Sequence, residues 1–64
     1  MDLETIRKRL SKYRIENDLG FKEMSLSIGM SVGNLWKFLN DKVNPNERTL
    51  YKIKKYLKKN GVSV

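Results

Sequence analysis

Apolar side chains recur every three or four residues along most of the chain, which is the spacing of one face of an α-helix. Four segments carry this pattern, and no stretch alternates apolar and polar residues as a half-buried strand would. The pattern predicts an all-α fold in a single domain, residues 1–64, with a short tail at 61–64. The expected helices cover about 2–17, 21–28, 32–40 and 47–60.

The middle of the chain contains two short amphipathic segments joined at Gly29. Glycine adopts a left-handed backbone without steric cost, so Gly29 predicts the end of one helix and a sharp turn. Ser31 can cap the next helix by accepting from its first backbone N–H groups, and Met30 between them is expected to be buried. The core residues expected here are Met24, Ile28, Met30, Leu35 and Phe38, whereas Leu26 is expected to be exposed.

The first and last segments are predicted to cover these two helices with further apolar stripes. Asp18, Leu19 and Gly20 break the first helix, and Leu19 is expected to fold inward. Asn46 is the expected cap of the last helix, and Gly61 is its expected stop. The stripes are formed by Leu3, Ile6, Leu10, Tyr13 and Asn17 in the first helix and by Leu50, Ile53 and Leu57 in the last.

The arrangement of helix, glycine turn and second helix resembles the helix-turn-helix of phage repressor and Cro proteins, the lambda-repressor-like domains. That family has a small residue where Ser25 stands, glycine at Gly29 and a buried aliphatic residue at Leu35. The run from Phe38 to Pro45 is similar to the family's exit from its recognition helix, with Asp41 where glycine is more usual. The resemblance covers most of the chain and implies a compact four-helix domain that inserts one helix into the major groove of double-stranded DNA.

Charge and composition agree with a polyanionic partner. The 64 residues carry a net charge of +7 with a pI near 9.9, which favours nucleic acid first and an acidic membrane or protein surface second. The chain has no cysteine and no histidine, so disulfides and thiolate or imidazole metal sites are excluded. We therefore expect a cytoplasmic protein that is not an enzyme and has no cofactor, no small-molecule ligand and no membrane span.

The outward face of helix 32–40 is the candidate surface for reading bases. Lys37 can donate to guanine, Asn40 can pair with adenine or hold a phosphate, and Val32 or Trp36 can meet thymine methyl groups. The full set expected to read bases is Ser31, Val32, Gly33, Trp36, Lys37 and Asn40. The residues expected to hold the phosphate backbone are Lys22, Lys42, Asn44 and Arg48.

The chain departs from the family in three ways. The usual fifth helix would begin where the sequence reaches residues 62–64, which leaves the mode of any dimer open. Arg14 has no acid at the family's usual position, so its expected partner is another acid or water. Phe21, Val32 and Trp36 replace residues that are usually polar.

Two functions follow from these residues. The first is a small phage-type or plasmid-type transcriptional regulator that binds double-stranded DNA, with a homodimer on a palindromic site as the arrangement the resemblance implies. The alternative is a protein-interaction module whose apolar patch of Phe21, Val32 and Trp36 binds another regulator or a polymerase.

Overall fold

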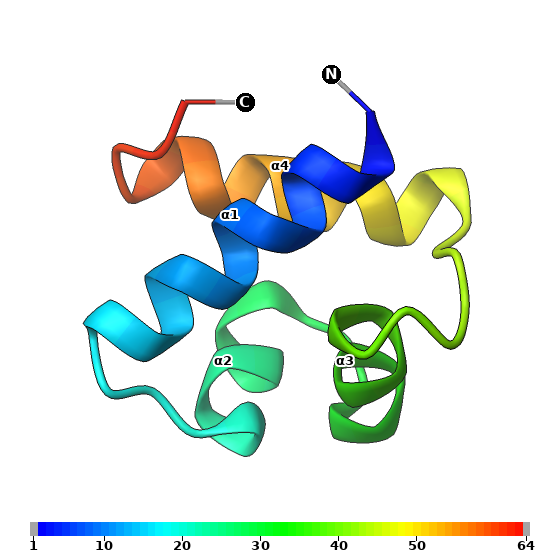
Figure 1. Cartoon of the computed structure of the whole chain (residues 1–64), viewed down its shortest axis with the longest axis horizontal. Coiled ribbons are helices and arrows are strands. Elements are labelled where there is room, and N and C mark those ends of the chain that lie inside the picture. Colours follow the sequence, from blue (N-terminus) through cyan, green and yellow to red (C-terminus); the bar gives the residue numbers. More distant parts are fainter. Residues whose placement is uncertain (1, 64) are drawn as a thin grey trace.

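The chain forms four helices in the computed structural model, which describes residues 2–63. They are α1 (Leu3–Glu16), α2 (Phe21–Ile28), α3 (Val32–Leu39) and α4 (Glu47–Lys59), and the described residues contain no strand (Figure 1). The predicted all-helical fold is confirmed, and the predicted helices differ from the observed ones only at flanking cap residues. No helix within residues 2–63 is long and apolar enough to cross a membrane. The last residue of the predicted tail 61–64 lies outside the described residues.

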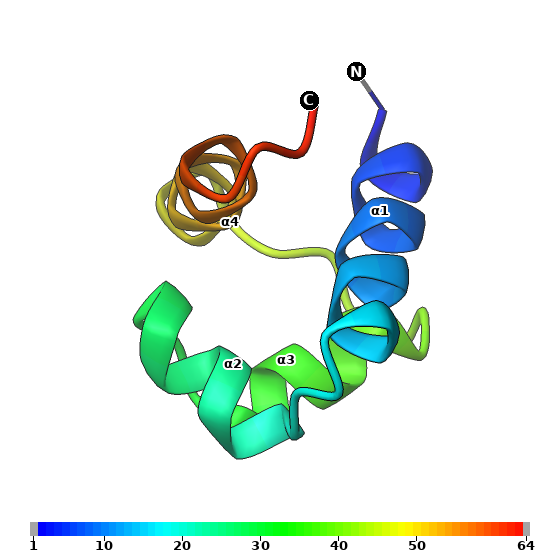
Figure 2. The same ribbon diagram turned by 90° about the vertical axis from the view of Figure 1, so that its left-hand side faces the viewer.

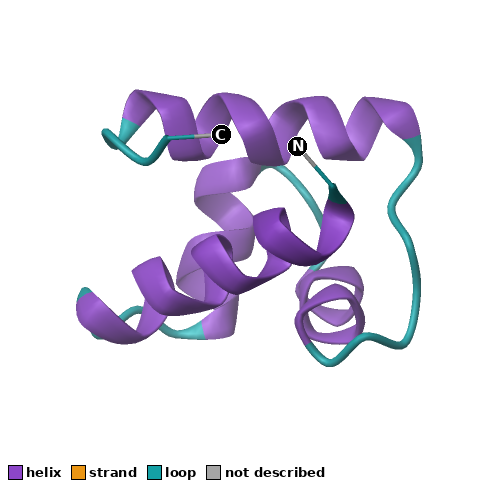
Figure 3. Cartoon of the chain, turned by 45° about the horizontal axis from the view of Figure 1, so that its top comes forward, coloured by secondary structure: helices purple, strands orange, loops and turns teal. Residues whose placement is uncertain are grey.

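The helices enclose one core. α4 runs along one side of the molecule, α2 and α3 lie next to each other on the opposite side, and α1 runs from the level of α4 toward that of α2 (Figures 1 and 2). A view turned toward the top shows α3 almost end-on below α4, with loops joining all the helices (Figure 3). Every helix contributes two buried apolar residues to the core, namely Ile6, Leu10, Met24, Ile28, Leu35, Phe38, Ile53 and Leu57. Burial of each such side chain stabilises the fold by about 1.5 to 3 kcal/mol.

Three of the helices begin at a side chain that caps the first turn. Asp2 accepts from the backbone N–H of Thr5 at 2.8 Å, and Asn46 accepts from Thr49 at the same distance. Ser31 accepts from the N–H of Asn34 at 3.2 Å. The predicted caps Ser31 and Asn46 are confirmed, and each satisfies a donor that the helix itself cannot pair.

Each helix is followed within two residues by a residue with a left-handed backbone. Glycine fills this position after α2 and α4, with φ of 92° at Gly29 and 79° at Gly61. Aspartate fills it after α1 and α3, with φ of 52° at Asp18 and 58° at Asp41. Gly20, by contrast, has an ordinary φ of −77° at the start of α2. The break predicted at Asp18, Leu19 and Gly20 is confirmed, and the residue in it that adopts the left-handed backbone is Asp18.

The backbone N–H that follows each left-handed residue donates to a carbonyl five residues earlier. The four bonds run from Leu19 to Arg14, from Met30 to Ser25, from Lys42 to Lys37 and from Val62 to Leu57. This is the Schellman pattern, in which the chain turns back across the helix end. Leu19, Met30 and Val62 then pack against the core. The inward position predicted for Leu19 is therefore confirmed, whereas Met30, expected to be buried, is only partly buried against the core. Residues 61–63 close α4 rather than extend away from it.

An asparagine precedes the left-handed residue at three of these ends. The side-chain amides of Asn17, Asn40 and Asn60 each donate to the carbonyl four residues earlier, at 2.9, 2.9 and 2.8 Å. Each of these carbonyls also accepts the backbone N–H of the same asparagine, so the amide adds a second hydrogen bond at the helix end. The same hydrogen bond from an asparagine side chain is therefore found at the ends of α1, α3 and α4. Asn17, which was expected on the apolar stripe, is instead exposed at the end of α1.

Arg14 ties α1 to the start of α2 without an acid. Its guanidinium carbon lies 4.3 Å from the centre of the Phe21 ring, and one terminal nitrogen donates to the carbonyl of Leu19 at 3.1 Å. No acid pairs with Arg14 in residues 2–63, so the expected acidic partner is wrong. The attraction between a cation and an aromatic face, together with the carbonyl bond, takes its place.

The left-handed aspartate after α1 yields a stability prediction. Asp18→Gly removes the steric cost that a side chain carries at positive φ, so we expect the free energy of unfolding to rise by about 0.5 to 1 kcal/mol. Gly29→Ala introduces that cost at the matching end of α2 and should lower it by about 1 to 2 kcal/mol. Urea unfolding followed by circular dichroism measures both changes. A loss of stability in Asp18→Gly would contradict this view of the helix ends.

Candidate nucleic-acid interface

α3 has one buried face and one exposed face. Leu35 and Phe38 are buried in the core, and Leu39 packs against it from the side. Val32 and Trp36 are each 47% exposed on the other side of the helix. Trp36 therefore lies outside the core, as the helical register predicted. The fold presents most of the surface of α3 to solvent.

All six residues that were expected to read bases are exposed, but two of them have structural roles. The hydroxyl of Ser31 is engaged as the cap of α3, and the amide of Asn40 holds the carbonyl of Trp36. Because Asn17 and Asn60 make the same bond in α1 and α4, the end of a helix explains Asn40 without any ligand. The remaining candidates on the exposed face are Val32, Gly33, Trp36 and Lys37.

Asn34 is an exposed polar residue of α3 that the sequence interpretation missed. Its backbone N–H pairs with Ser31, whereas the side chain lies on the solvent side of the first turn. It precedes Lys37 by three residues, so the two side chains are neighbours on the helix surface. That spacing is visible in the sequence and could have identified Asn34. An amide beside an ammonium group gives this face both acceptor and donor groups for base edges.

The four residues expected to hold phosphates are also exposed, and they come from three parts of the chain. Lys22 is in the first turn of α2, and Arg48 is in the first turn of α4. Lys42 and Asn44 belong to the loop between α3 and α4. They flank α3 in sequence on both sides, and none of the three basic side chains forms an ion pair within residues 2–63.

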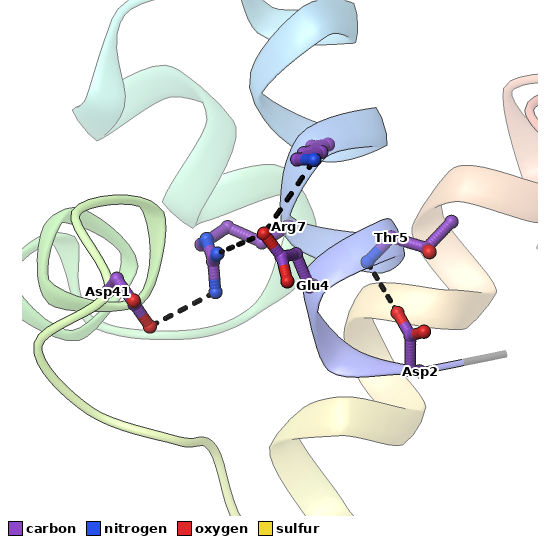
Figure 4. Close-up of polar contacts among 6 residues, drawn as sticks. Asp2, Glu4, Thr5, Arg7 and Asp41 are labelled. Atoms are coloured by element: carbon purple, nitrogen blue, oxygen red, sulfur yellow. Dashed lines mark hydrogen bonds and ion pairs between the residues drawn. The ribbon is translucent and has the colours of Figure 1, made fainter.

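A long-range ion pair fixes the C-terminal end of α3 against α1. Arg7 donates to the carboxylate of Asp41 at 3.1 Å and lies 3.6 Å from that of Glu4, which also approaches Lys8 (Figure 4). The side chain of Arg7 is only 17% exposed, so it is held against the protein surface rather than free in solvent. Asp41 thus has two tasks, the left-handed turn and the contact with α1.

The first turn of α1, where Asp2 caps Thr5, lies near this ion pair (Figure 4). The hydrogen bond from the backbone N–H of Thr5 holds the pKa of Asp2 below its usual value, because it favours the charged carboxylate.

The turn that leads into α3 is fixed by its own contacts. Ser25 is buried, and its hydroxyl donates to the carbonyl of Lys22 at 2.8 Å, so its polar atom is satisfied inside the core. Gly29 makes the turn, and its carbonyl accepts from the ammonium group of Lys52 on α4 at 3.0 Å. A cation at the C-terminal end of α2 also opposes the negative end of the helix dipole. The orientation of α3 therefore depends on contacts at both of its ends.

The apolar patch expected from Phe21, Val32 and Trp36 is smaller than the sequence suggested. Phe21 is partly buried, packs against the core and is covered by the guanidinium of Arg14. Val32 and Trp36 remain exposed and lie four residues apart, which places them side by side on α3.

No family model, no curated protein and no solved structure matches this chain. Among residues 2–63, histidine, cysteine, aspartate and glutamate nowhere form a group of three or more that could hold a metal ion.

The structural role of Asn40 at the end of α3 can be tested by measuring stability alone. Asn40→Ala removes the side-chain hydrogen bond to the Trp36 carbonyl, which keeps its backbone donor, and should lower the free energy of unfolding by about 0.5 to 1.5 kcal/mol. Asn34→Ala, the matched control on the same helix, should change it by less than about 0.5 kcal/mol. Thermal unfolding measures both. Equal stabilities of the two variants would show that the amide of Asn40 does not hold the end of α3.

Proposed function

We propose that this protein is a small transcriptional regulator of the phage repressor and Cro helix-turn-helix type, which binds double-stranded DNA through α3. The observation that carries the proposal is that α3 is anchored in the core on one face and exposed to solvent on the other. Leu35 and Phe38 hold α3 in the core, while Lys37 and its neighbours face solvent. A helix that enters the major groove needs such an arrangement, because base edges are reached only by side chains on its free side.

The chemistry of the outer face supports contact with bases. Lys37 offers a charged donor for guanine, and Asn34 offers the donor and acceptor pair that suits adenine. Val32 and Trp36 offer apolar surface for thymine methyl groups. Gly33 has open space where a side chain would be, so a DNA strand can approach the backbone of α3 there. One helix thus offers a charged donor, an amide, an apolar surface and close approach to its backbone.

Net charge supplies the remaining affinity. Lys22 lies in α2, before α3 in sequence, and Lys42 lies in the loop that follows α3. Each of these two lysines can hold a phosphate. With about four phosphates neutralised, affinity should fall by roughly two decades for a fourfold rise in salt. A salt response this steep is expected for duplex DNA of any sequence.

A second candidate function is supported by Val32 and Trp36. Exposed tryptophan is enriched at the centres of protein interfaces, and Val32 extends the apolar surface by one helical turn. In this alternative, α3 docks on another regulator or on a polymerase. The patch is small because Phe21 is covered, so DNA binding remains the better supported function.

Paired variants of α3 separate the two functions. If α3 reads DNA, Lys37→Ala should cost about 1 to 3 kcal/mol at duplexes selected from a randomised library and spare nonspecific duplexes. Trp36→Ala should weaken the selected site as well. Both residues are exposed, so neither change should unfold the domain. The measurements are DNA titration and thermal unfolding on the same two variants.

Lys22→Ala is the control, since a phosphate contact should weaken selected and nonspecific duplexes alike. Under the protein-binding alternative, Trp36→Ala would abolish binding to a partner, and Lys37→Ala would have little effect on DNA or partner. Failure of any duplex to be enriched from the library, or an affinity that does not respond to salt, would contradict the DNA proposal.

A further inference from the structure

A groove lies between the C-terminal end of α2 and one side of α4. Its volume is about 590 Å³, which is in the range of pockets that hold small ligands or single extended chains. None of its lining residues is acidic. They are Ser27 and Ile28 from α2 and Arg48, Tyr51, Lys52, Lys55, Tyr56, Lys59 and Asn60 from α4 and its end.

The cations of this groove form one line along α4. Arg48, Lys52, Lys55 and Lys59 are separated by four, three and four residues, so they lie on one face and span roughly 16 Å of the helix. Lys52 donates to the carbonyl of Gly29. Arg48, Lys55 and Lys59 form no ion pair within residues 2–63. The groove therefore presents a row of positive charge that no acid of the described chain neutralises.

Two tyrosines accompany this row. Tyr51 is 64% exposed, so most of its ring surface is free for a ligand. Tyr56 is partly buried and packs edge-on against Tyr13, with ring centres 5.8 Å apart. Burial raises the pKa of Tyr56, with a smaller contribution from Tyr13, so the phenol stays neutral and adds no negative charge to the groove.

The groove is separate from the outer face of α3, although Arg48 belongs both to its lining and to the residues expected to hold duplex phosphates. In two perpendicular views α4 and α3 lie on opposite sides of the molecule (Figures 1 and 2). A duplex held by α3 would leave the C-terminal half of α4, with Lys55 and Lys59, on the far side. These residues therefore need another explanation than the DNA contact proposed for α3.

We propose that this groove binds single-stranded nucleic acid, with successive phosphates along Arg48, Lys55 and Lys59 and a base stacked on Tyr51. Basic grooves with interleaved aromatic rings bind single strands in this way, because every base has a face that can stack. In a duplex the bases are paired and stacked on one another, so none is available to the exposed ring of Tyr51.

An acidic polypeptide fits the groove less well. Carboxylates are recognised best by the planar fork of arginine, whereas three of the four cations are lysines, which act as point charges toward phosphates. The groove also has only one aliphatic lining residue, Ile28, and peptide docking generally needs apolar anchor pockets.

The test uses a fluorescein-labelled ten-nucleotide oligothymidine and fluorescence anisotropy with the full chain. The double variant Lys55→Ala/Lys59→Ala should weaken binding by about tenfold, because two phosphate contacts are lost. The matched control Lys54→Ala/Lys58→Ala removes the same charge from the same helix but outside the groove lining, and it should cost less than about threefold. All four lysines are exposed, so both variants should keep the wild-type melting temperature.

The stacking contact has its own pair of variants. Tyr51→Ala should weaken binding of the oligothymidine by at least about fivefold, whereas Tyr51→Phe, which keeps the ring, should retain it within about twofold. An unlabelled random duplex or a poly-glutamate peptide, at equal concentration of charge, should displace the oligothymidine poorly.

Three results would overturn the proposal. They are an equal loss in the two lysine double variants, no loss in Tyr51→Ala, and displacement by the duplex or the peptide as effective as by unlabelled oligothymidine. The inference is separable from DNA binding by α3, because the tested groove variants leave Arg48, the residue shared with the expected duplex contacts, unchanged. Lys37→Ala should leave oligothymidine affinity unchanged, and the groove variants should keep the preference for selected duplexes, so failure of one proposal does not imply failure of the other.

Discussion

Burial of one face of α3 is the constraint on which the rest of this small fold depends. A chain of 64 residues without cysteine has no disulfide to support it, so its stability depends on the apolar contacts of its four helices. Leu35 and Phe38 commit α3 to that core and thereby determine which side of the helix faces outward. At eight residues α3 is too short to be stable alone, so its conformation depends on tertiary packing.

Contacts at the helix ends fix where each helix stops and how α3 is placed, which a small core alone does not determine. Each helix closes with a left-handed residue, and three of those closures are reinforced by an asparagine amide. The two ends of α3 are further held from outside, by Arg7 through Asp41 and by Lys52 through the Gly29 carbonyl. A surface ion pair contributes about 1 kcal/mol or less to stability, so its more significant effect here is on the placement of α3.

Features determined by local sequence could be predicted, and those determined by tertiary contacts could not. Gly29, Ser31 and Asn46 act within a few residues of themselves, so turn and cap chemistry located them correctly. The Arg7–Asp41 pair joins residues 34 positions apart, and only the folded chain brings them together.

On the candidate site, helical periodicity placed Trp36 and Lys37 outside the core but gave no sign that Asn40 serves the helix end. Comparison of Asn40 with Asn17 and Asn60, each followed by a residue that tolerates a left-handed backbone, could have revealed it. The groove beside α4 depends on how α2 packs against that helix, which no local pattern contains.

The central claim is that the outer face of α3, and not another basic surface, meets duplex DNA. The most direct measurement is a two-dimensional ¹H–¹⁵N spectrum of the labelled protein, recorded during titration with a selected duplex and with a random duplex. We expect the selected duplex to shift the indole N–H of Trp36 and the amides of residues 31–37 most strongly, with weaker changes near Lys22 and Lys42. Shifts confined to α4, with the Trp36 indole unchanged, would contradict the account.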